Sequence, residues 1–221
     1  MKKINNFIID ITGSSGSGKT TLAKKLARKY NYSVIFSGLL FRYAAKEILE
    51  KNPRNRISFL KKIFSKINYK KLQRLNLHTP EISSFTSEIA KKLEIRKIIK
   101  KKQKQIVKKR KKVVLEGRDG SKIFPNADVK FYVVCSPIKI AAKRRFKQLK
   151  KKNKSITLSE VLKDLKKRDF MDRHRRFSRL ERHAEAVYIN TAKLDIGTAV
   201  AKMSKVVDKK LKNYGNRRKL R

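Results

Sequence analysis

Residues 7–26, FIIDITGSSGSGKTTLAKKL, join a short apolar run to a glycine-rich segment and then to an amphipathic helical pattern. The segment GSSGSGKT, residues 13–20, matches the phosphate-binding loop pattern: glycine, any four residues, glycine, lysine, and serine or threonine. A flexible Gly/Ser linker is the alternative, but a linker would not be bracketed by a strand and an amphipathic helix. This stretch therefore predicts a strand, a loop and a helix that bind a nucleoside triphosphate.

The chemistry of triphosphate binding explains the spacing of these residues. Glycines allow the backbone to turn tightly and direct N–H groups inward, while the first turn of the next helix adds unpaired donors and a positive dipole. We expect Lys19 to reach the β- and γ-phosphates and the Thr20 hydroxyl to bind Mg²⁺. The predicted phosphate cradle consists of Gly13, Ser14, Ser15, Gly16, Ser17, Gly18, Lys19 and Thr20.

Length and composition limit the class of protein. The 221 residues are enough for one α/β domain with insertions, and the 39% of apolar residues can form its core. No window approaches the roughly 18 uninterrupted apolar residues of a membrane span, and the N-terminus lacks the apolar core of a secretory signal. We therefore expect a cytoplasmic protein. The single cysteine, Cys135, excludes a disulfide framework and a cysteine-based metal cluster.

The net charge has two interpretations. The chain contains 62 Lys and Arg residues and 17 Asp and Glu residues, which gives a formal net charge of +45. Clustered basic residues favour a polyanionic partner such as RNA. The lysines are also scattered along helical faces among many Ile and Asn residues, which is typical of a genome-wide codon bias. In either case we expect nonspecific attraction of nucleotides and RNA at low salt.

Strand-like and helix-like patterns alternate along the chain and predict a parallel sheet wrapped by helices. Apolar runs predict five strands, at residues 7–11, 32–36, 113–115, 128–135 and 186–189. Helical patterns begin near residues 20, 39, 80, 95, 137, 158 and 196. The roughly fifty residues between the second and third strands exceed an ordinary connection, so we expect a separate lobe for a second substrate.

Polar residues follow the third predicted strand and cluster again on a later helix. Residues 116–119, Glu-Gly-Arg-Asp, lie at the carboxyl end of a parallel strand, where α/β sheets bind ligands, although a plain turn is the alternative. Arg168, Asp172 and Arg175 are spaced by four and three residues, so they share one helical face. That face is either a local ion-pair ladder or a surface that meets phosphate and sugar.

Taken together, these motifs resemble those of the bacterial-type cytidylate kinases, within the nucleoside monophosphate kinase group. The resemblance covers nearly the whole chain, and its motifs occur in the family's order with similar spacing. The matching segments are residues 13–20, Ser37-Gly38 with Arg42, residues 79–83 with Ser87 and Arg96, Gly117-Arg118-Asp119 with Phe124-Pro125, and Arg168-Asp169 with Asp172 and Arg175. Each short motif is weak alone, whereas six in order are fairly specific.

The resemblance implies that the γ-phosphate of ATP passes to CMP or dCMP in the presence of Mg²⁺, and it assigns roles to individual residues. It implies that the CMP phosphate is bound by Arg42, Arg118 and Arg175, the ribose by Arg168 and Asp172, and the cytosine by Ser87, Arg96 and Asp119. Ser37 joins this substrate-binding set. The residues implied to act in catalysis are Lys19, Arg118 and Arg175. ATP would also contact Thr21 and two arginines, Arg144 and Arg145, which would flank a lid.

The same resemblance implies a three-layer α/β P-loop kinase fold with a five-stranded parallel sheet. We expect a core of residues 1–37, 96–146 and 159–221, an inserted CMP-binding lobe at 38–95 and a small lid at 147–158. The expected partners are the nucleotides alone, with a monomeric chain, no membrane and no specific nucleic acid.

This sequence departs from the family pattern at three places. Thr12 stands where the family usually has aspartate, the segment 120–123 is one residue short, and His78 replaces a common arginine. Two alternatives remain open. The acceptor could be UMP or another small phosphate acceptor, or the chain could be an RNA-associated ATP-binding protein whose lysine-rich helix at 95–112 contacts RNA.

Overall fold

The structure of the chain is a computed structural model that describes residues 6–151 and 154–217. The ends of the expected core (residues 1–5 and 218–221) and the centre of the expected lid (residues 152–153) lie outside the described residues. The chain divides into two units. The first comprises the described residues up to Ile35 and from Lys111 onward, and the second comprises Phe36–Arg110.

A five-stranded parallel sheet forms the centre of the first unit, in the order β2-β3-β1-β4-β5. The strands are β1 (Phe7–Gly13), β2 (Ser33–Phe36), β3 (Lys112–Gly117), β4 (Val129–Val134) and β5 (Val187–Asn190). β1 is central, with Ile9 beside Val114 on β3 and Val129 on β4. These apolar side chains are almost completely buried, as parallel strands covered on both faces require. The five predicted strands are therefore confirmed.

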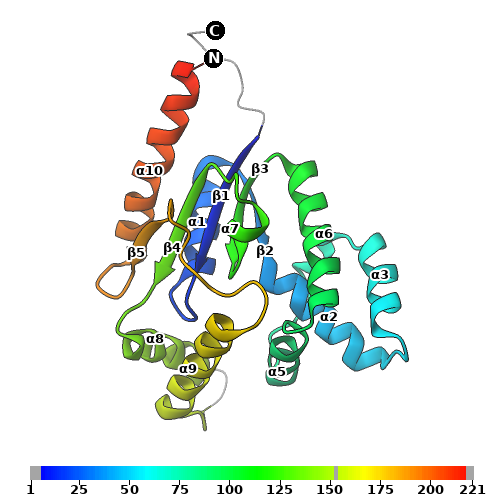
Figure 1. The fold of residues 1–221 in the computed structure, drawn as a ribbon. Coiled ribbons are helices and arrows are strands. Elements are labelled where there is room, and N and C mark those ends of the chain that lie inside the picture. Colours follow the sequence, from blue (N-terminus) through cyan, green and yellow to red (C-terminus); the bar gives the residue numbers. More distant parts are fainter. Residues whose placement is uncertain (1–5, 152–153, 218–221) are drawn as a thin grey trace. The chain divides into compact units, whose positions relative to one another are not determined.

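Helices cover this sheet and lie beyond its carboxyl edge. They are α1 (Lys19–Tyr30), α7 (Gly120–Ile123), α8 (Ile138–Lys150), α9 (Leu158–His174) and α10 (Ile196–Arg217). α1 packs against β3 and α10, whereas α7 packs against β1. Figure 1 shows α8 and α9 beyond the carboxyl ends of the strands, and they pack on each other through Ala141, Val161 and Leu165. The ends of the central strands and the C-terminal end of α9 meet at one edge, where Asp169 contacts Ser15.

The second unit is helical. Its elements are α2 (Ser37–Lys51), α3 (Arg56–Lys66), α4 (Tyr69–Leu72), α5 (Pro80–Ile89) and α6 (Leu93–Arg110). Thr79 caps α5 by accepting a hydrogen bond from the Ile82 amide, which agrees with the helix start expected at Thr79-Pro80. α2 begins directly at Ser37, two residues before the expected start. The mixed apolar and lysine-rich sequence of α3 and α4 does not predict their secondary structure.

The division of the chain differs from the expected boundary at residue 95. α6 belongs to the second unit because it packs on α2 and α3, so that unit extends to Arg110. The lysine-rich helix also ends at Arg110 rather than residue 112, since Lys111 has a left-handed backbone (φ 61°) and Lys112 opens β3. Among the described residues, none of the helices is long and apolar enough to cross a membrane.

Candidate active site

The phosphate loop connects β1 to α1 and adopts the glycine-dependent conformation that its pattern predicts. Gly13 has a φ of 153°, and a Cβ there would lie 1.8 Å from the Val133 carbonyl oxygen on the neighbouring strand. Gly16 has a φ of 69°, and a Cβ there would lie 3.1 Å from the Ala141 Cβ on α8. Only glycine fits without strain at these two positions, where the loop passes against β4 and α8.

Lys19, the lysine of the loop, is buried at the start of α1. Its ammonium group donates to the Ser14 carbonyl and lies 3.3 Å from the Ser17 hydroxyl oxygen. Burial, assisted by the positive charge of Arg118, lowers the pKa of Lys19 from 10.5 to about 7. A group held so far from water gains strongly when an anion enters the loop, because the anion stabilises its charged form. The loop is therefore electrostatically suited to a phosphate.

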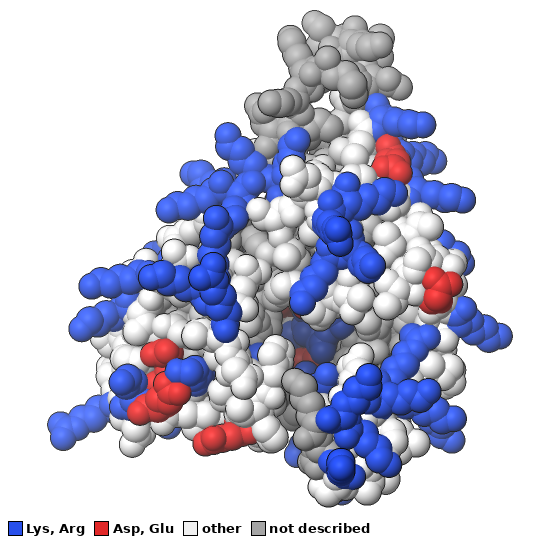
Figure 2. Space-filling model, turned by 180° about the vertical axis from the view of Figure 1, so that it is seen from behind, with Lys and Arg blue, Asp and Glu red and all other residues white. Residues whose placement is uncertain are grey.

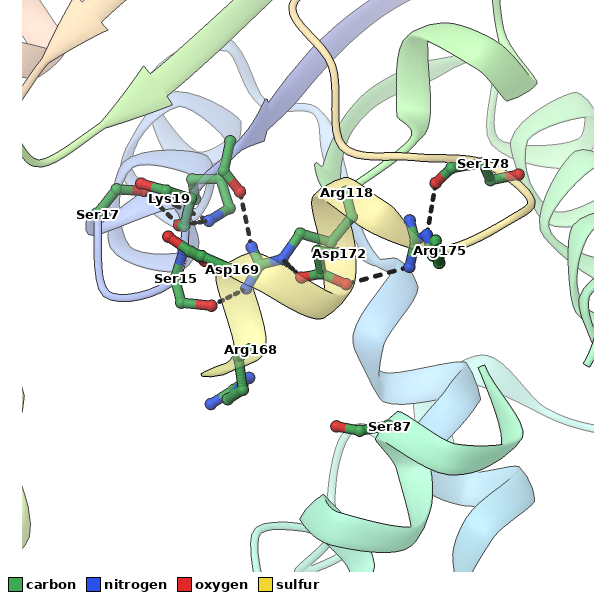
Figure 3. A network of polar contacts seen from close by, with 12 residues as sticks. Ser15, Ser17, Lys19, Ser87, Arg118, Arg168, Asp169, Asp172, Arg175 and Ser178 are labelled. Carbon is green, nitrogen blue, oxygen red and sulfur yellow. Dashed lines mark hydrogen bonds and ion pairs between the residues drawn. The ribbon is translucent and has the colours of Figure 1, made fainter. Parts of the chain in front are cut away.

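Arg118 follows β3 and reaches across to the loop, as Figure 3 shows. One terminal nitrogen donates to the Gly13 carbonyl and the other to the Ser15 hydroxyl, each at 2.9 Å. Its Nε donates to the Asp172 carboxylate on α9 at 2.7 Å. Burial alone would lower the pKa of Arg118, but the negative charges of Asp172 and Glu116 outweigh burial and raise it. Arg118 therefore stays charged and joins β3, the loop and α9.

Of the three residues predicted to share one face of α9, two are in contact, Asp172 and Arg175. Asp172 pairs with Arg118 through one oxygen and with Arg175 through the other, the second at 3.1 Å. Arg175, the residue that ends α9, also donates from Nε to the Ser178 carbonyl at 2.6 Å. Arg168 points away from these contacts in Figure 3 and lies 3.7 Å from Asp164. Asp172 is therefore paired with two arginines, Arg118 and Arg175, whereas the Arg168 guanidinium lies apart from them.

Asp169 contacts the phosphate loop directly, and the sequence did not predict this role. Its Oδ1 accepts a hydrogen bond from the Ser15 backbone N–H at 2.7 Å. Ser15 and Asp169 are separated by 154 positions in the chain. The only signal in the sequence is that Asp169 sits inside the arginine- and aspartate-rich segment 168–175.

A buried carboxylate, Asp10, lies on β1 below the loop. It accepts a 2.5 Å hydrogen bond from the Ser121 hydroxyl on α7 and longer ones, of 3.1 and 3.2 Å, from the Thr12 hydroxyl. Burial raises the pKa of Asp10 from 3.8 to about 6, although these hydroxyls act in the opposite direction. A Cβ at Gly120 would lie 1.8 Å from Asp10, so glycine lets α7 approach it. Asp10 and Thr12 share one face of the strand because side chains alternate with a period of two.

Other residues predicted for the nucleotide site belong to the first unit. Arg144, on α8, donates to the Ala192 carbonyl at 3.0 Å, in the segment after β5. Arg145 is exposed and bonds only weakly to Gln148, at 3.4 Å. Thr20 and Thr21 are exposed in the first turn of α1, whereas Asp119 is buried at the start of α7.

Four predicted substrate residues belong to the second unit and are described within it. The Ser37 hydroxyl accepts a 2.9 Å hydrogen bond from the Gln103 amide. Arg42 donates to the Leu77 carbonyl at 3.1 Å and to the Ser83 hydroxyl at 2.7 Å.

The remaining two, Ser87 and Arg96, lie on α5 and α6. The Ser87 hydroxyl donates to the Ser83 carbonyl at 3.3 Å. Arg96 is the largest fully buried side chain among the described residues. It donates to the Ala90 carbonyl at 2.9 Å, and its guanidinium carbon lies 5.2 Å from the Phe41 ring centre. Its position within the helical unit shows a packing role that the sequence pattern did not predict.

The residues present are compatible with a magnesium ion held mainly by a bound nucleotide. In the described part of the chain, no three His, Cys, Asp or Glu residues group to hold a metal ion. Mg²⁺ in nucleotide sites usually takes only one or two protein ligands and completes its octahedron with phosphate oxygens and water. Thr20, an exposed residue in the first turn of α1, supplies one hydroxyl for that limited requirement.

A central strand ending in this loop, with Lys19 and Arg118 directed at it, defines the class of P-loop kinases. Two solved structures agree with this fold. An uncharacterized protein from Eubacterium ventriosum has a TM-score of 0.51 and 18% identity, covering 92% of this chain and 99% of that one. Shikimate kinase from Bacteroides thetaiotaomicron has a TM-score of 0.50 and 16% identity, covering 91% of this chain and 98% of that one.

Sequence comparison identifies the family within this class. A family model described as cytidylate kinase matches residues 9–209. The cytidylate kinase of Bartonella bacilliformis is 34% identical over 95% of this chain and 98% of its own length. The cytidylate kinase of Thermosipho melanesiensis is 34% identical over 92% of this chain and 98% of its own length. The chain therefore belongs to the cytidylate kinase family and is a phosphotransferase, which confirms the resemblance inferred from its motifs.

Proposed function

We propose that the chain transfers the γ-phosphoryl group of ATP to CMP or dCMP and releases ADP with CDP or dCDP. The observation that carries this proposal is the contact between the phosphate loop and the arginine- and aspartate-rich end of α9, made by Arg118. A triphosphate loop alone serves many reactions. A loop joined to a cluster of guanidinium groups suits a second phosphate as acceptor, because arginine binds planar phosphate oxygens in pairs.

On the donor side, the loop and Lys19 would hold the ATP phosphates through N–H groups and one positive charge. Thr21, Arg144 and Arg145 would contribute further contacts to ATP. The Thr20 hydroxyl would hold Mg²⁺, which when bound neutralises charge on the β- and γ-phosphates. The residues proposed for the donor site are 13–21, 144 and 145.

On the acceptor side, we assign the CMP phosphate to Arg42, Arg118 and Arg175, and the ribose to Arg168 and Asp172. Asp172 now accepts from both Arg118 and Arg175. When CMP binds, its phosphate would replace some of the contacts that Asp172 makes with Arg118 and Arg175. Both guanidinium groups would then still face a negatively charged partner. The proposed contacts to the base come from Ser87, Arg96 and Asp119, and Ser37 belongs to the same substrate-binding set.

The reaction needs no covalent intermediate. Phosphoryl transfer is catalysed mainly by holding donor and acceptor in line and by neutralising charge on the transferred group. Lys19, Arg118 and Arg175 would supply that charge. A lid at residues 147–158 would exclude water, which limits wasteful ATP hydrolysis.

The wider assignments follow from the same function. We assign residues 38–95 of the second unit to CMP binding and the remaining core to ATP binding, in a chain that works as a monomer in the cytoplasm. The basic surface supports only nonspecific attraction of nucleic acid. Figure 2 shows Lys and Arg at several separate places on the visible face, with uncharged residues between them, and not gathered in one stripe.

The test is a transfer assay with ATP labelled at the γ-phosphate and CMP as acceptor. We expect the label to appear in CDP, identified by chromatography against authentic CDP. Label found only in inorganic phosphate would contradict the proposal. Label on no acceptor, together with RNA binding that weakens steeply with salt, would favour the RNA-associated alternative.

A further inference from the structure

We infer that Asp169 is a positioning residue that fixes α9, the helix with the acceptor residues, to the phosphate loop. This inference rests on the proposed function. The side chains of Arg168 and Asp172, its neighbours on α9, face Asp164 and Arg118. Asp169 instead accepts from the Ser15 N–H at 2.7 Å, which is short for a bond between a backbone amide and a carboxylate.

Ser15 is the point where two separate connections from α9 meet. Its N–H bonds directly to Asp169, and its hydroxyl accepts from Arg118, which is held by Asp172. Ser15 is only 2% exposed, so water does not readily substitute for either bond. The loop and α9 are therefore joined twice at one residue, once by a direct bond and once through a guanidinium group.

Apolar packing next to this contact fixes the same two elements. Gly16 passes so close to α9 that a Cβ there would lie 3.3 Å from a methyl carbon of Leu165. Leu165 is buried and precedes Asp169 by four residues, one turn of the helix. The packing of Gly16 against Leu165 sets the distance between loop and helix. The directional hydrogen bond between Ser15 and Asp169 sets their register, which here means the position of α9 along its own axis relative to the loop.

The register of α9 matters because donor and acceptor must be aligned for transfer. Arg168, Asp172 and Arg175 are on α9 or at its end, while the loop holds the donor phosphates. A displacement of about 1 Å between reacting groups can cost on the order of 100-fold in rate. Loss of the Asp169 bond should therefore lower kcat, while ATP binding, which depends on Lys19 and on the loop N–H groups other than that of Ser15, should change little.

A different role for the same carboxylate predicts a different result. If Asp169 acted as an internal anion that competes with the nucleotide phosphates, removing its charge would tighten ATP binding. Asp169→Asn separates the two roles, because an amide oxygen still accepts from the Ser15 N–H but carries no charge. Asp169→Ala removes both the bond and the charge.

The experiment compares kcat and the two KM values of Asp169→Ala, Asp169→Asn and wild type, with CMP and ATP as substrates. We expect kcat of Asp169→Ala to fall at least about tenfold with KM for ATP changed less than about threefold, and Asp169→Asn to recover most of kcat. Glu94→Gln, which removes an equal charge from an exposed pair with Lys97, is the charge-matched control. An alanine variant with kcat near that of wild type, an equally poor asparagine variant, or tighter ATP binding in both would overturn the inference.

A second readout does not depend on catalysis. The Ser15 amide proton, bonded to a carboxylate, should resonate downfield in the nucleotide-free protein and move upfield in Asp169→Ala, in a spectrum that otherwise shows a folded chain. An unchanged Ser15 resonance in an active enzyme would refute the positioning role. The Ser15 resonance could instead shift in Asp169→Ala while the wild-type protein fails to phosphorylate CMP. That result would refute the proposed function but would confirm the contact between Asp169 and Ser15.

Discussion

Arg118 and Asp172 connect the end of β3 to α9 through an ion pair with Nε 2.7 Å from Oδ2. The other two nitrogens of the same guanidinium bond to Gly13 and Ser15 of the phosphate loop. A planar side chain with five fixed donors can satisfy three partners at once, which a lysine ammonium group cannot do in the same plane. Arg118 therefore links the end of β3, the phosphate loop and α9 through one side chain.

Arg118→Lys should impair the enzyme although it keeps the charge. The variant loses the paired contacts to the loop and to Asp172, and a hydrogen bond to a charged group contributes about 1.5–3 kcal/mol. We expect kcat/KM for CMP to fall by one to two orders of magnitude, roughly. Steady-state kinetics check this, with exposed Arg74→Lys as the matched control. Near-normal activity of Arg118→Lys would show that its planar geometry is unimportant.

Lys19→Ala should lower turnover by roughly 10²- to 10³-fold, the usual cost of removing one charge that stabilises a transition state. The fold should persist, because Lys19 is buried with a depressed pKa and its removal relieves a desolvation cost. Circular dichroism and kcat measure the two effects separately. Lys25→Ala, an exposed change on the same helix, should leave both unchanged. Retained activity in Lys19→Ala would disprove the assignment of the loop.

ATP binding should take up protons above neutral pH. In the empty site Lys19 has a pKa of about 7, below its ordinary 10.5, so at pH 8 it is mostly neutral. Phosphate favours the charged form and raises this pKa, so binding should draw in nearly one proton at pH 8 and fewer at pH 6. Calorimetry in buffers of different ionisation enthalpy measures this number. Lys19→Arg, always charged, should show no such uptake, and its absence in wild type would count against a neutral Lys19.

Much of the fold could be predicted from the sequence because its signals are local. The phosphate loop, the buried strands and the Thr79 cap of α5 each depend on residues close together in the chain. Helices α3 and α4 could not be predicted, because lysines interrupt their apolar faces and only packing within the second unit reveals which side is inward, as with Leu60, Phe64 and Leu72.

The candidate site was predictable in its residue types but not in its contacts. Lys19, Arg118 and Asp172 were identified from motifs, yet nothing local shows that Asp169 reaches Ser15, since the bond spans 154 positions. Asp10 was missed because it lies inside an apolar run and its partner Ser121 is far away in sequence. The burial of Arg96 against Phe41 likewise depends on helix packing that spacing alone does not reveal.

Asp10→Asn should change how stability depends on pH. Burial raises the pKa of Asp10 to about 6 in the folded chain, above its ordinary 3.8, so the folded state holds this proton more firmly. The unfolded chain therefore loses the proton first as pH rises. The contribution of Asp10 to the free energy of unfolding falls between about pH 3 and 7, by roughly 3 kcal/mol. Urea denaturation of both proteins at pH 4.5 and 7 should show the variant gaining relative to wild type at the higher pH. An equal difference at both values would contradict a raised pKa.

The most direct test of cytidylate kinase activity is an ADP-release assay in which CMP, dCMP, UMP and AMP are offered separately with ATP held constant. A cytidylate kinase should give kcat/KM values for CMP or dCMP well above those for UMP and AMP, with little ADP formed when no acceptor is present. Equal or better use of UMP or AMP, or ADP release that does not depend on any acceptor, would contradict transfer to CMP or dCMP as the reaction of this enzyme.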